Sequence, residues 1–110
     1  MKRLLFGVMA SLLTVSAAIA ADSGPKADIA ALRALAASRP HVTVDNVRVA
    51  GNYAALDWIM PPAGGMSIYK RATGHHWTLL MSDGGVVTAG DAIKKGVPAA
   101  TAHKLLPGTP

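Results

Sequence analysis

Residues 42–60 read VTVDNVRVAGNYAALDWIM, and this stretch decides the fold. Valines recur at every second position on either side of Asp45-Asn46, a pattern typical of a half-buried strand with a bulge or bend. Gly51-Asn52 is a tight hairpin signal. Tyr53 to Met60 then alternates again, with Leu56, Trp58 and Met60 on one face. The stretch therefore predicts two antiparallel strands joined by a short turn.

Two more strands are predicted downstream of this hairpin. Pro61 to Gly65 has the composition of a loop, and Met66 to Arg71 alternates as a third strand. After a turn at Thr73-Gly74, the fourth strand is predicted from His76 to Met81. Its apolar residues Trp77, Leu79 and Met81 are expected to share one face. The four strands would form an up-and-down antiparallel meander.

A helical pattern precedes the strands. Pro25 suits the first helical position, and apolar residues then recur at helical spacing, with Arg33 on the other side. Asp28 falls in the first turn, where a carboxylate is favoured by the helix dipole. The helix is expected to end near Ser38, because Pro40 disfavours a helical conformation in the residue before it.

Two shorter helices are predicted after the strands. Thr88 and Asp91 have the spacing of a capping box, and Gly96 suits a left-handed C-cap. A last helix runs from Ala99 to Leu106, and residues 107–110 are expected to be a frayed tail. Residues 21–106 thus form one α+β domain, an N-terminal helix packed on a four-stranded antiparallel meander and followed by two short helices. This order resembles small cystatin-like or NTF2-like domains, which implies a fold and no function.

The first twenty residues have the pattern of a cleavable signal peptide. Lys2 and Arg3 precede an uncharged run from Leu4 to Ala20, which closes on Ala18-Ile19-Ala20. The cut is predicted after Ala20, and the expected location is the periplasm or the medium. A membrane anchor is the alternative, although about seventeen apolar residues are marginal for a span. Cleavage would remove two of the eleven basic residues and none of the six acidic ones, so that the net charge falls from +5 to +3.

Composition excludes several kinds of chemistry. The 110 residues include no cysteine, which removes disulfides, thiolate metal sites and cysteine catalysis. The basic residues are scattered along the sequence rather than clustered, so they do not indicate a nucleic-acid-binding surface. The chain also lacks a nucleophile elbow and phosphate-binding loops. An enzyme would have to combine Asp57 with His41 or His76, so we expect the protein to be non-enzymatic.

Methionine offers a speculative metal site. In the predicted meander, Met60, Met66 and Met81 lie at one end of the sheet together with His41. Thioethers and an imidazole suit Cu(I), so copper is a possible cofactor. The alternative is that the methionines fill gaps in the core, because Met60 shares a face with Trp58, and Met81 shares a face with Trp77.

Part of the chain resembles a family of small exported proteobacterial proteins identified as copper uptake system-associated. The likeness spans residues 47–106, and its elements are turns and core aromatics: Tyr53-Ala54, Asp57-Trp58, Gly64-Gly65, Lys70-Arg71, Trp77, Leu79-Leu80, Gly84-Gly85 and Gly96-Val97-Pro98. Family members often have a cysteine after the fourth strand, where this chain reads Leu80-Met81-Ser82. The resemblance implies a periplasmic accessory protein of copper handling that binds Cu(I) weakly or docks a copper carrier.

The residues leave an alternative function open, one without a metal. A compact exported α+β domain with two sheet edges and no catalytic set suits a protein-binding module, such as an inhibitor of an exported enzyme. Its partner would be another exported protein, with no nucleic acid and, after cleavage, no membrane. The oligomeric state stays open.

Overall fold

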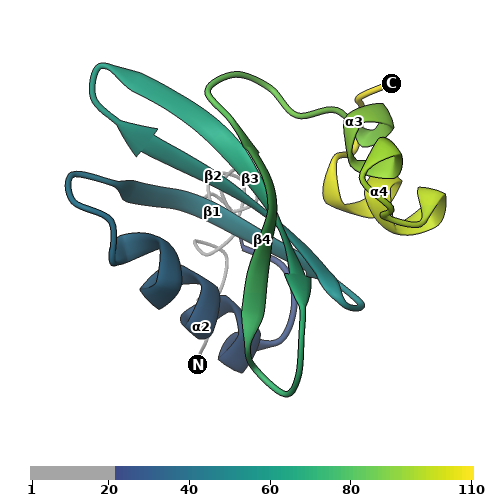
Figure 1. Ribbon diagram of the computed structural model, residues 1–110, viewed down its shortest axis with the longest axis horizontal. Helices are drawn as coiled ribbons and strands as arrows, with labels where there is room; N and C mark the ends of the chain where they lie inside the picture. The colour runs from purple at the N-terminus through teal and green to yellow at the C-terminus, as the bar shows by residue number, and fades with distance from the viewer. Residues whose placement is uncertain (1–21) are drawn as a thin grey trace, which may run out of the picture.

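The computed structural model describes residues 22–110 and has three layers, with the sheet in the middle (Figure 1). The elements in chain order are α2 (Lys26–Ala37), β1 (Thr43–Ala50), β2 (Tyr53–Met60), β3 (Ala63–Arg71), β4 (Trp77–Asp83), α3 (Ala89–Lys94) and α4 (Ala99–Leu105). The predicted α+β class and the helix–meander–helices order are confirmed. The predicted signal peptide lies outside the described residues.

Helix α2 forms from an alanine-rich segment with high helix propensity. It begins after the N-cap Pro25, one residue later than predicted, and ends at the C-cap Ser38, as predicted. Leu32 and Ala36 are its fully buried apolar residues, and they face the sheet. Asp28 is also buried, which the first-turn position did not lead us to expect.

The sheet is a simple meander with the strand order β1-β2-β3-β4. The register of β1 against β2 shifts between Val44 and Asn46, which confirms the bulge or bend predicted at Asp45-Asn46. Because of that shift, valines on both sides of the bulge reach the same core. Gly51 has a φ of 61° in the β1–β2 turn, a conformation that glycine adopts without strain.

A second register shift corrects the prediction for β4. The partners change between Ile68 and Tyr69, which face Met81 and Leu79 respectively, so that Leu80 is the extra residue. Trp77 packs with the α2 side of the sheet, whereas Met81 packs with the opposite side. The prediction that these residues share one face is therefore wrong, because a bulge inverts the alternation after Leu79.

The predicted loop at 61–65 is shorter than expected, since β3 begins at Ala63. Gly64 and Gly65 pair with Ile59 and Trp58 as part of the ladder. A Cβ at position 65 would collide with the Trp58 ring and the carbonyl oxygen of Asp83. Glycine is therefore required here, because the indole of Trp58 occupies the space that a side chain would fill.

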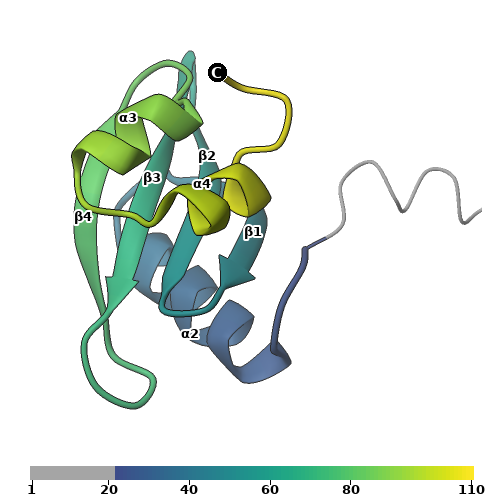
Figure 2. The ribbon, with the colours of Figure 1, turned by 90° about the vertical axis from the view of Figure 1, so that its right-hand side faces the viewer.

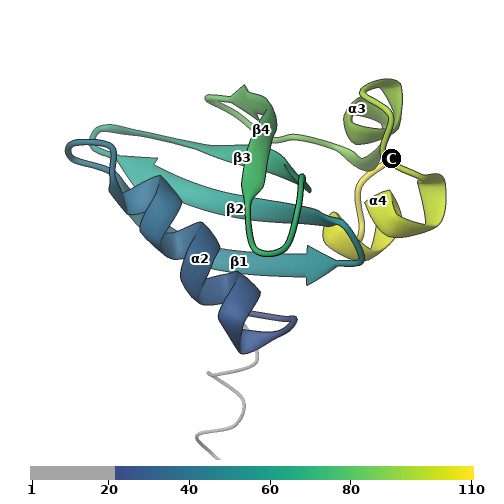
Figure 3. The same cartoon turned by 60° about the horizontal axis from the view of Figure 1, so that its bottom comes forward.

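Each sheet face has its own hydrophobic core. On the α2 face, Leu32 and Ala36 pack on strand residues, which are Val47, Ala54, Leu56, Tyr69 and Trp77. On the other face, α3 and α4 cover Ala55 and Ile68 (Figure 2). The helix residues of this second core are Ala89, Ala92, Ala102 and Leu105, and the neighbouring loops add Val87, Val97 and Leu106. The opposite placement of α2 and the two short helices is also visible in Figure 3.

The C-terminal segment is fixed by hydrogen bonds. Thr88 and Asp91 form the predicted capping box at the start of α3. The tail then returns to this helix: Ala89 donates its N–H to Thr109 Oγ1 at 2.8 Å, and Gly90 donates to the carbonyl of Pro110 at 2.8 Å. The prediction of a frayed tail at 107–110 is therefore wrong, because these residues satisfy the free N–H groups of α3. Within residues 22–110, no helix is long and apolar enough to cross a membrane.

The tight fit at Gly65 generates a stability prediction. Gly65→Ala should lower the free energy of unfolding by about 2 kcal/mol, the usual cost of forcing one methyl into a packed site. Gly84→Ala is the matched control, since nothing lies within 4 Å of a Cβ placed there. Urea unfolding of the three proteins measures both changes, and an equal loss in the two variants would contradict the argument.

Candidate functional site

The two edges of the sheet differ. The outer edge of β1 is covered by the segment Asp22-Ser23: Ser23 donates its N–H to Val47 O at 3.0 Å, and Val49 donates to Ser23 O at 2.7 Å. Asp22 Oδ1 accepts a further bond from the N–H of Val47 at 2.8 Å. Arg33 holds the Asp22 carboxylate with Nε and Nη2, at 3.1 and 2.8 Å. The segment Asp22-Ser23, held by the ion pair between Arg33 and Asp22, thus covers the edge of β1.

The β4 edge has no such cover in the part of the chain that the structure describes. The strand order of the sheet places β4 at one end, next to β3. Leu79 points to the α2 face and is 45% exposed. The strand Trp77–Asp83 carries neither proline nor lysine, the residues that commonly block an exposed edge. Its outward backbone groups are available for pairing.

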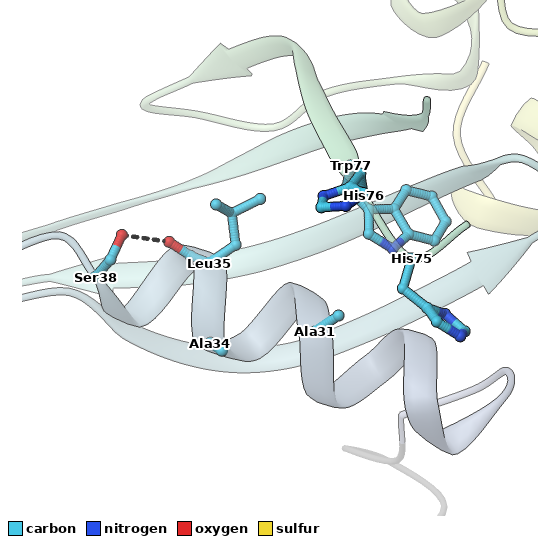
Figure 4. Close-up of a pocket in the computed structure, with 7 residues that line it drawn as sticks. All are labelled: Ala31, Ala34, Leu35, Ser38, His75, His76 and Trp77. Atoms are coloured by element: carbon cyan, nitrogen blue, oxygen red, sulfur yellow. Dashed lines mark hydrogen bonds between the residues drawn. The ribbon is translucent and has the colours of Figure 1, made fainter. Parts of the chain in front are cut away.

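An open groove lies between α2 and the start of β4 at Trp77 (Figure 4). It has a volume of about 410 Å³ and is lined by Ala31, Ala34, Leu35, Ser38, His75, His76 and Trp77. Small alanines on α2 leave room above the sheet, and the exposed Leu35 adds an apolar wall. The two histidines come from the β3–β4 turn. The groove therefore combines apolar walls with nitrogen donors at one end.

A buried ion pair fixes the turn end of this groove. The Asp28 side chain is 5% exposed, and both of its oxygens accept bonds from Arg71 Nη1 and Nη2 at 2.9 Å. His75 Nδ1 lies 3.1 Å from Asp28 Oδ1, and the imidazole itself is 68% exposed. These bonds tie the first turn of α2 to the end of β3 and to the following turn.

Arg71 has every donor engaged. Besides the two bonds to Asp28, its Nη1 donates to Gly74 O at 3.0 Å and its Nη2 donates to Gly51 O at 3.3 Å. Its Nε donates to Asn52 Oδ1 at 3.2 Å. The guanidinium also lies 4.4 Å from the ring centroid of Trp77, a cation–π contact. One cation therefore positions α2, two turns and the groove's tryptophan.

Electrostatics favour the ionised form of Asp28. Hydrogen bonds from Arg71, ahead of those from His75, lower the pKa of the carboxyl to about 2, against the opposing effect of desolvation. Asp28 also raises the pKa of the Arg71 guanidinium. The pair is charged at every physiological pH, so it is a fixed structural tie rather than a proton donor.

Both tryptophans have a buried indole N–H without an acceptor. Trp58 Nε1 and Trp77 Nε1 have no hydrogen-bond partner among the described residues. Trp77 is 7% exposed and lines the groove, whereas Trp58 lines a separate small cavity of about 10 Å³. A buried donor without a partner costs free energy, and both N–H groups are closed to solvent.

The structure brings two of the four predicted copper ligands into one core cluster. Met66 and Met81 pack against the core under α3 and α4, and Met66 Sδ accepts a bond from the N–H of Val87 at 3.4 Å. Met60 continues the alternation of Leu56 and Trp58 on the opposite, α2 face. His41 lies at the Met60 end, because its neighbour Thr43 pairs with Ile59.

The structure places Asp57 and His76 apart. No group of three or more His, Cys, Asp or Glu side chains that could hold a metal ion occurs in residues 22–110. Asp57 instead forms an ion pair with Arg48 at 3.5 Å. His76 lines the groove on the other sheet face.

Comparison with known proteins finds no matching family model, no similar curated protein and no similar solved structure. The site must therefore be interpreted from its own geometry. Sequence reasoning placed Asp28 in the first helical turn and Arg71 at the end of a strand, but it had no signal that the two meet across 43 residues.

The buried pair predicts a steep pH dependence of stability. The folded pKa of Asp28 is depressed, so its contribution is complete above the unfolded value of 3.8 and is lost as pH falls toward about 2. Asp28→Asn should cost up to about 3 kcal/mol at pH 7, because the partly buried Arg71 guanidinium loses its counter-ion. The free energy of unfolding of Asp28→Asn should also fall less between pH 4 and pH 2 than that of the wild type.

Asp57→Asn is the matched control for this experiment. It removes the partner of a longer and more exposed ion pair, so we expect a loss of about 0–1 kcal/mol. Urea unfolding across this pH range measures both variants. Equal losses at pH 7 would contradict the structural role of the Asp28–Arg71 pair.

Proposed function

We propose that the protein is a non-enzymatic accessory protein of the periplasm that works by docking a segment of a partner protein on β4. The observation that carries this proposal is the asymmetry of the sheet: β1 is closed by Asp22-Ser23, while β4 is open beside an apolar groove. An extended segment can add to such an edge through backbone hydrogen bonds and place alternate side chains in the adjoining groove.

Export is supported by the sequence pattern of residues 1–20 and agrees with an accessory role outside the cytoplasm. The class of partner follows from the family resemblance, which makes a copper-carrying protein the first candidate to test. In this form of the proposal the metal belongs to the partner. Direct ligation by Met60, Met66, Met81 and His41 would require residues from both sheet faces to converge.

The docking proposal predicts that one exposed residue of β4 decides partner binding. Leu79→Lys places a charge on the open edge beside the groove and should weaken partner capture at least tenfold. Ile93→Lys is the matched control, because Ile93 is 39% exposed on α3, which covers the sheet face opposite to that of Leu79. The measurement is quantitative capture of copper-carrier proteins and other partners from periplasmic extract by the immobilised full chain.

Two outcomes of this capture experiment would contradict the docking proposal. One is that no specific partner is retained by the wild type. The other is that Leu79→Lys retains the partner as well as Ile93→Lys does. Unfolding curves of both variants verify that each keeps the fold.

Direct copper binding has its own test. We expect equal Cu(I) affinity in competition titrations of the wild type and of a variant with Met60, Met66 and Met81 replaced by Leu, since Met66 and Met81 pack against the core and Met60 is exposed at the end of β2. Such swaps nearly conserve volume and should keep the fold. Tighter binding by the wild type would restore the methionine site as the functional centre.

A further inference from the structure

We infer that β4 pairs with β4 of a second copy of this chain, in an antiparallel arrangement about a two-fold axis. The pairing joins two four-stranded sheets into one continuous sheet. It requires no other protein and so goes beyond the proposed docking function. It is supported by the free edge, by the match between the side chains of the two copies, and by the charges near the two ends of β4.

The edge itself has the properties of a self-pairing strand. β4 forms one margin of the sheet (Figure 2), where Leu79 is 45% exposed and Leu80 and Met81 are half-buried. Two identical edges that pair antiparallel make a closed dimer, since each copy occupies the edge that the other offers. The β1 edge is covered by Asp22-Ser23, so the assembly ends at two copies.

The side chains of β4 divide into two sets, because the bulge at Leu80 inverts their alternation. The set on the α2 face contains Leu79 and Ser82, whose cross-strand partners Tyr69 and Ser67 lie on that face. The set on the face under α3 and α4 consists of Thr78, Leu80, Met81 and Asp83. Directly opposed residues of antiparallel strands point to the same face, so each set has to meet the same set of the second copy.

One register satisfies this condition for every residue from Thr78 to Asp83. It places Thr78 opposite Asp83 of the copy, Leu79 opposite Ser82, and Leu80 opposite Met81. At the two-fold axis, the half-buried Leu80 and Met81 of both copies then form one apolar cluster that continues the core under α3 and α4. On the α2 face, Leu79 and its copy become diagonal neighbours within reach of each other.

The charges near the two ends of β4 are complementary in this register. Asp83 and Lys70 are both exposed, and neither takes part in an ion pair within residues 22–110. Lys70 is the β3 partner of Thr78, which stands opposite Asp83 of the copy. Two strand spacings therefore separate Lys70 from that carboxylate, about 10 Å between Cα atoms, which a long lysine side chain can span. The two-fold axis makes this contact twice.

The test reverses the two charges one at a time. Lys70→Asp sets a like charge against Asp83 of the copy, and Asp83→Lys does the same to Lys70. Each variant alone should have a dimer affinity lowered about tenfold or more. An equal mixture of the two variants should regain dimers, because in the mixed pair each of these contacts joins opposite charges. Sedimentation velocity of the full chain at low salt measures the dimer fraction over a concentration series.

Lys104→Asp is the control with the same change of charge. Lys104 lies on α4, which packs over β1 and β2, so the dimer fraction should not change. Urea unfolding verifies that each variant keeps the fold. Within one chain, Lys70 and Asp83 lie at opposite ends of the β3–β4 ladder, so recovery in the mixture can come only from a contact between chains.

Three results overturn the dimer. The first is a wild type that stays monomeric at every concentration. The second is a dimer that survives Lys70→Asp or Asp83→Lys unchanged. The third is a mixture of the two variants that regains no dimer.

The dimer and the docking function fail in different ways, although both use the same edge. If the wild type is monomeric but partner capture is lost in Leu79→Lys, the dimer is overturned and docking on β4 stands. If the dimer forms but capture is unaffected by Leu79→Lys, docking on β4 is overturned and the dimer stands.

Discussion

The guanidinium of Arg71 is the interaction on which the arrangement of the domain depends. Its five N–H donors reach Asp28 on α2, Gly51 and Asn52 in the β1–β2 turn, and Gly74 in the β3–β4 turn. These segments are far apart in sequence, and the guanidinium holds them at hydrogen-bond distance from one another. Burying such a charge is favourable only when all its donors are satisfied, so the pieces are held in one geometry.

A second ion pair works with Arg71 to fix the position of α2. Arg33 binds Asp22 on the β1 side of the helix, while Asp28 binds Arg71 on the side of the β3–β4 turn. The helix is therefore anchored at both flanks and packs its buried Leu32 between them. Because the anchors are ionic and directional, they set the distance between α2 and β4 and leave the groove open where alanines face it.

The spacing of apolar residues, together with the residue types at turns and helix caps, predicted most of the fold. The alternation in Tyr53–Met60, the bulge at Asp45-Asn46 and the capping box of Thr88 all act within a few residues. The bulge at Leu80 was missed because its cause is tertiary: Leu80 and Met81 both pack under the C-terminal helices. The groove was missed for the same reason, since no local pattern indicates that Asp28 meets Arg71. The methionine end was predicted from a sequential strand order, which the structure has, but strand order does not say which thioethers pack into the core.

Closing one sheet edge has a consequence for how the other can be used. A sheet with two open edges can pair with further copies without limit, which leads to aggregation. With Asp22-Ser23 bound along β1, a strand added to β4 leaves no second edge on this molecule for continued growth. The groove wall is already fixed by buried charges, so a docked segment does not have to order it, and less binding free energy is lost. A rigid groove beside a single open edge therefore favours one specific strand over unlimited self-association.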